Sequence, residues 1–195
     1  MMTYILWYFM ITAGFVGCAV VAAWTWFRFP ERTAQDVVDF LLPVDMEKVE
    51  ALLDPVAEGT LRRQLDREEF RQLQRKRIHL YLSFVKRMAH NASVLIDWAN
   101  REAESNDEKM IQLAQELQQG AVEVRLYSLL TLLKLRFWLL LRVDSWRILP
   151  IPSLYDVREL GGIQGAKSYD RLKTTAGFLF LEMQQPNFEQ LFQNL

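Results

Sequence analysis

The sequence predicts an all-α protein, in which an N-terminal single transmembrane helix precedes a cytoplasmic helical bundle built on a long antiparallel helical hairpin. Three observations support this fold class. Residues 4–27 carry no charge, apolar residues recur at helical period through most of the remaining chain, and neither proline nor glycine interrupts residues 60–119. We find no stretch that alternates polar and apolar residues as a half-buried strand does.

Residues 1–29 form the predicted transmembrane anchor. Its 24 uncharged residues, 4–27, would extend about 36 Å as a helix, which is enough to cross a hydrocarbon core of about 30 Å. Aromatic side chains bracket the segment, as they do at membrane interfaces. A cleaved signal is a weaker interpretation because no basic residue precedes the segment. Lipid attachment at Cys18 is weaker still, since the residues after it are not polar.

The flanks of the anchor predict its orientation. Arg28 and Arg32 follow the segment and no Lys or Arg precedes it, so the N-terminus is expected outside and the body in the cytoplasm, at the inner membrane. A chain with one cysteine, and so no disulfide framework, suits that compartment. Gly14, Cys18 and Ala22 recur every four residues, which is typical of a surface for membrane helix packing.

Residues 30–59 are predicted to form short acidic linker helices. The first runs from about Thr33 to Leu41, and Asp45 caps the second, which ends at Asp54-Pro55. Residues 28–60 contain three basic and eight acidic side chains.

Residues 60–149 form the predicted hairpin. Asp66 and Glu69 have the spacing of a capping box, and a turn near Asn106-Asp107 separates two helices of about 40 residues. Counting outward from the turn places Phe84 and Met88 opposite residues 126–130. One side of the second helix is expected to form the core stripe: Leu126, Leu130, Leu133, Phe137 and Leu140. Further leucines lie on the opposite side, so this helix is either central in the bundle or offers a second face to a partner: Leu132, Leu135 and Leu139.

Residues 150–195 are predicted to form small C-terminal helices packed on the base of the hairpin, the end away from its turn. One is expected before Gly161-Gly162, and another over residues 165–183. The inward side of the second helix contains Leu172, Ala176, Leu179 and Met183.

The hairpin base is predicted to be basic. Residues 60–85 contain seven basic and three acidic side chains, and residues 122–147 contain five and two. Candidate lipid or partner contacts are Arg75, Lys76, Arg77, Lys134, Arg136 and Arg142. The alternative is that the acidic linker helices neutralise the base internally.

No motif indicates catalysis, a cofactor or a metal. His79 and His90 would lie about 16 Å apart along one helix, too far for a shared ion. The 23 basic and 24 acidic residues nearly cancel, so no global field favours nucleic acid. We therefore expect a non-enzymatic scaffold or accessory subunit in the lipid bilayer, whose partner is a membrane protein or another copy. The alternatives are an anionic-lipid-binding module that uses the basic base, and an enzyme with carboxylates between helices.

Overall fold

The computed structural model describes residues 34–104, 107–139, 153, 154, 156, 163–183, 191 and 195. The predicted anchor lies outside these residues, as do Leu140 and most of the predicted helix before Gly161-Gly162. Contacts divide the chain into Met1–Thr33 and Ala34–Leu195, and the described residues all lie in the second unit. Its described elements are all helices, which confirms the all-α class. Within the described ranges, no helix has the length and apolar character needed to cross a membrane.

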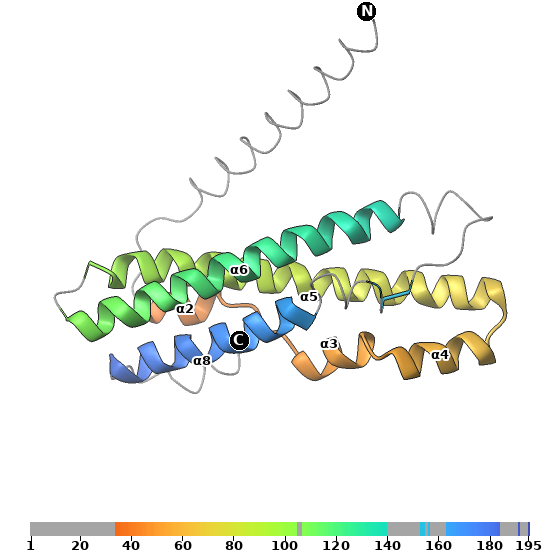
Figure 1. Cartoon of the computed structure of the whole chain (residues 1–195), viewed down its shortest axis with the longest axis horizontal. Coiled ribbons are helices and arrows are strands. Elements are labelled where there is room, and N and C mark those ends of the chain that lie inside the picture. Colours follow the sequence, from red (N-terminus) through yellow and green to blue (C-terminus); the bar gives the residue numbers. More distant parts are fainter. Residues whose placement is uncertain are drawn as a thin grey trace, which may run out of the picture. The chain divides into compact units, whose positions relative to one another are not determined.

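The predicted helical hairpin is present as α5 (Arg67–Glu102) and α6 (Glu108–Trp138). Asp66 and Glu69 make the capping box that starts α5: Asp66 Oδ1 accepts from the Glu69 N–H at 2.7 Å, and Glu69 Oε2 accepts from the Asp66 N–H at 3.3 Å. Asp107 caps α6 through the Lys109 N–H at 2.9 Å. The two helices pack along their length (Figure 1).

Three short helices run antiparallel to α5: α2 (Ala34–Phe40), α3 (Met46–Leu52) and α4 (Pro55–Gln64). Contacts with α5 occur in reverse order along the chain. His90 Nε2 lies 3.0 Å from Phe40 O, and further along, Arg77 Nη2 donates to Leu52 O at 2.7 Å. The α3 cap at Asp45 is as predicted. The prediction missed α4, because Pro55 begins this helix at its first position rather than only ending α3.

The helix α8 (Ile163–Glu182) runs antiparallel to α6. Lys109 Nζ pairs with Glu182 Oε2 at 2.7 Å, and Ser168 Oγ donates to Glu123 Oε2 at 3.4 Å. An added Cβ at Gly165 would lie 3.4 Å from Tyr127 Cβ, so the two helices approach closely here. These contacts place α8 on the half of the hairpin nearer the turn and not at the base, where the sequence placed the C-terminal helices. As predicted, Leu172, Ala176 and Leu179 of α8 are buried, and Met183, directly after the helix, is half-buried.

One buried side chain joins three parts of this bundle. Asn91 on α5 is fully buried. Its Oδ1 accepts from the Leu42 N–H at 2.8 Å, and its Nδ2 donates to Leu42 O at 2.8 Å and to the Tyr169 hydroxyl at 2.6 Å. Burial raises the pKa of Tyr169 well above its ordinary value. Asn91 therefore holds the connection after α2 and the helix α8 against α5.

Candidate functional site

The side of α6 that faces away from α5 is apolar over its C-terminal half. We call this surface the outer face of α6. It consists of Val122, Leu126, Leu129, Leu130, Leu133 and Phe137, each between 50% and 59% exposed. Leucine and phenylalanine side chains favour burial, and contiguous exposed apolar patches are rare on monomeric soluble proteins unless they bind something.

The buried side of α6 follows a regular alternation of four- and three-residue steps. Its members are Met110, Ala114, Leu117, Ala121, Val124, Ser128, Thr131, Leu135 and Trp138. This is the spacing of a helix that packs in a left-handed pair, and it leaves the outer face on the opposite side. Leu126, Leu130, Leu133 and Phe137 were predicted as the core stripe, and that prediction is wrong. The predicted second side is the buried one, since Leu135 and Leu139 are in the core and Leu132 is half-buried.

The register expected for the hairpin changes accordingly. Phe84 and Met88 are buried as predicted. Leu126 and Leu130 are exposed, however, and point away from α5. In this stretch of α6, Val124 and Ser128 are the residues on the buried side. The small side chains on that side suit the large ones of α5, because a helix pair packs best when bulky residues meet small ones.

The same surface is polar over the first half of α6. Gln112, Gln115, Glu116 and Gln119 are exposed and line a shallow hollow with Gln118. The change from polar to apolar side chains falls at Gly120. Because both halves of α6 pack on α5 in the same spacing, core packing does not account for the change. The apolar half is therefore a local surface feature.

Charged side chains border the outer face. Glu123 and Arg136 are exposed at its two ends, and Arg125 is half-buried. Lys134 donates to Asp156 O at 2.7 Å, and its ammonium lies 4.7 Å from the centroid of the Trp138 ring. The apolar stripe itself contains no charge.

The predicted contact residues of the hairpin base have different environments. Arg75 and Lys76 are exposed, as is Arg136. Arg77 is only 8% exposed, so it is not available to a headgroup or partner. Arg142 lies outside the described residues, and so do Gly14, Cys18 and Ala22.

Arg77 belongs to a buried polar cluster that the sequence did not predict. Glu58 is 4% exposed and Gln74 is fully buried. Glu58 Oε2 accepts from Gln74 Nε2 at 3.3 Å, from Arg77 Nη1 at 3.4 Å and from the Leu154 N–H at 3.1 Å. Burial lowers the pKa of Arg77, and the Glu58 carboxylate opposes that shift. An acidic residue before α5 thus neutralises one cation of the hairpin base from within the fold.

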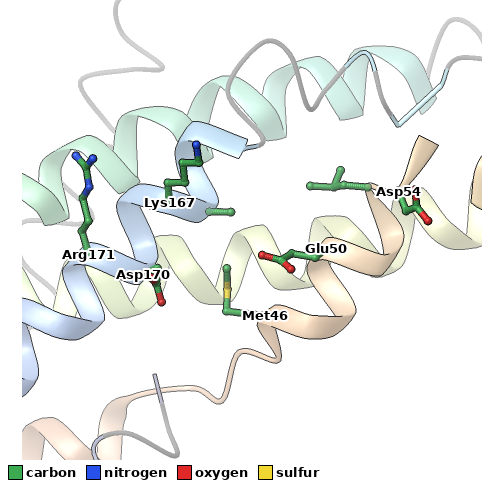
Figure 2. A pocket seen from close by; sticks show the side chains of 8 residues that line it. Met46, Glu50, Asp54, Lys167, Asp170 and Arg171 are labelled. Carbon is green, nitrogen blue, oxygen red and sulfur yellow. The ribbon is translucent and has the colours of Figure 1, made fainter. Parts of the chain in front are cut away.

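A cleft of about 630 Å³ lies between α3 and α8. Figure 2 shows Met46 and Glu50 of α3 directed toward the gap, whereas Lys167 and Arg171 of α8 point away from α3. Asp54, Asp170, Leu53 and Ala166 complete the lining. General acid–base chemistry needs ionisable groups that converge on one point, and the side chains of this cleft diverge.

In the described part of the chain, no group of three or more His, Cys, Asp or Glu side chains is placed to hold a metal ion. No family model, curated protein or solved structure matches the chain.

Proposed function

We propose that this chain is a membrane-anchored helical scaffold that binds a partner protein through the outer face of α6. The observation that supports the proposal is the exposure of six apolar side chains on one helix, with Leu133 reaching 59%. Their removal from water would contribute about 25 cal/mol per Å² of apolar area, which is the main driving force of protein association. A partner that presents an apolar helix suits a stripe without charges.

The proposed anchor is residues 4–27, oriented with the N-terminus outside. Its support is the uncharged length of the segment and the arginines that follow it. An anchor restricts the body to the membrane surface, which raises the local concentration of membrane-bound partners. The stripe of Gly14, Cys18 and Ala22 remains a predicted contact within the bilayer.

The competing function is a module that binds anionic headgroups through the basic base. It has support from the exposure of Arg75, Lys76 and Arg136. The burial of Arg77 against Glu58 reduces the number of cations that such a module can offer. The diverging side chains of the α3–α8 cleft give an enzyme less support than the outer face gives a scaffold.

The full-length chain with Leu126→Glu and Leu133→Glu tests the proposal. Both side chains are more than half exposed, so the fold should persist. The variant should retain less than about a tenth of the partner captured by the wild type in mild detergent, because an unpaired charge in an apolar interface costs more than the roughly 1.4 kcal/mol that a tenfold change represents. Val56→Glu is the control, since Val56 is 73% exposed on α4. Equal capture by all three proteins would overturn the proposed site.

A further inference from the structure

The apolar positions on the outer face of α6 are symmetric about the midpoint between Leu129 and Leu130. Leu126 and Leu133 lie at equal distances on either side of it, and the outermost members, Val122 and Phe137, also match. A helix with this spacing presents the same apolar pattern when it is turned end for end. In an antiparallel pair of such helices, each apolar position of one copy therefore meets an apolar position of the other, as a twofold interface requires.

The charges beside the outer face favour the antiparallel arrangement. Glu123 and Arg136 are exposed and lie at equal distances from the midpoint, on opposite sides of it. An antiparallel pair places Glu123 and Arg125 of each copy at the same end as Lys134 and Arg136 of the other, so each end combines one anion with three cations. A parallel pair would instead gather both copies of Lys134 and Arg136 at one end, where four cations repel one another.

We infer that the partner on the outer face of α6 is the same face of a second copy of this chain, which lies antiparallel about a twofold axis near Leu129 and Leu130. This inference rests on the proposed function, because it names the partner of that same surface. Leu126 of each copy then lies opposite Leu133 of the other, and Leu130 lies opposite its symmetry mate. The stepwise spacing of the face is that of helices that pack side by side.

Disulfide trapping tests the inference in the full-length chain. Cys18 is the one natural cysteine, so Cys18→Ser provides the background. Leu126→Cys and Leu133→Cys are made in chains with different tags, reconstituted together in mild detergent and oxidised with copper phenanthroline. The antiparallel pair predicts at least tenfold more disulfide between the two chains than Leu126→Cys forms with itself. Leu130→Cys should form a disulfide with itself, and Val56→Cys on α4 should not.

Two outcomes would overturn the inference. The first is a higher yield of the disulfide between two Leu126→Cys chains than of the disulfide between a Leu126→Cys chain and a Leu133→Cys chain, which would show a parallel pair. Disulfide levels at all these positions no higher than that of Val56→Cys would show that the outer face does not meet its own copy. The position of the disulfide, rather than the molecular mass of the assembly, tests whether the outer faces meet. A dimer could also form through the stripe of Gly14, Cys18 and Ala22, which is a second predicted contact between copies.

The trapping experiment separates failure of this inference from failure of the proposed function. In one case the disulfides are absent, but the double variant Leu126→Glu, Leu133→Glu no longer binds a different protein, or anionic vesicles, that the Val56→Glu control still binds. The outer face then binds that other partner, and self-pairing is wrong. If the disulfides are absent and the same variant changes no association, both are wrong.

Discussion

Asn91 satisfies the hydrogen-bonding groups of two other segments with a single amide. It is fully buried, and both backbone groups of Leu42 as well as the Tyr169 hydroxyl depend on it. A carboxamide suits this position because it both donates and accepts. A leucine at the same place would fill the space but leave polar atoms without partners.

We predict that Asn91→Ala destabilises the protein by about 1–3 kcal/mol, the cost of one buried polar group left unsatisfied, because the Tyr169 hydroxyl is fully buried and loses its donor. Urea unfolding of the full-length chain in mild detergent, followed by circular dichroism, measures the change. Ser93→Ala is the matched control, because the Ser93 hydroxyl donates to Ala89 O on its own helix. A loss below about 0.5 kcal/mol for Asn91→Ala, the level of an ordinary surface substitution, would contradict this account.

The buried cluster of Glu58, Gln74 and Arg77 shows a limit of sequence analysis at the same scale. Gln74 and Arg77 are three residues apart on α5, which is the spacing of any solvated helix face. Nothing local distinguishes them from exposed polar residues. They are buried because α4 and Leu154 cover them, and both lie at some distance along the chain.

At the scale of elements, α6 has two apolar sides and only one of them is the core. The buried side includes Ala121, Ser128 and Thr131, which are smaller or more polar than the leucines outside. Ranking positions by hydropathy therefore selects the wrong side. The contact with α5 determines the choice, because small residues allow the close approach of two helices.

We predict opposite outcomes for two similar substitutions on α6. Leu135→Asp should unfold the bundle, because Leu135 is fully buried and an unpaired charge there costs several kcal/mol against a total stability of about 5–15 kcal/mol. Leu130→Asp should stay folded, because Leu130 is 50% exposed. Thermal unfolding by circular dichroism distinguishes the two. Measurements at two protein concentrations separate loss of folding from loss of self-pairing. Unfolding of both variants at every protein concentration would contradict this prediction and show that Leu130 belongs to the core.

At the scale of the whole molecule, α5 organises the described bundle. The helices α2, α3, α4, α6 and α8 all contact it, and 16 of its 36 residues are buried. The compact unit begins at Ala34, directly after the predicted anchor and the arginines that follow it.

We predict that a reporter active only in the cytoplasm, fused after Leu195, is active in cells. Arg28 and Arg32 lie immediately after the uncharged segment, and basic residues near a span are retained on the cytoplasmic side. A reporter that is active only outside the cytoplasm, fused at the same position, is the complementary control. Activity of that control alone would reverse the proposed topology and the compartment of every partner.

The sequence by itself determined the all-α class, the helical hairpin, and the caps at Asp45, Asp66 and Asp107. These features depend on hydrogen bonds and periodicity within a few residues, so the local sequence contains the necessary information. Only the tertiary structure decided which side of α6 is buried, where α8 packs, and that Glu58, rather than solvent, meets Arg77. Those outcomes depend on which surfaces meet across long separations in the chain, and hydropathy along α6 favours the side that stays exposed.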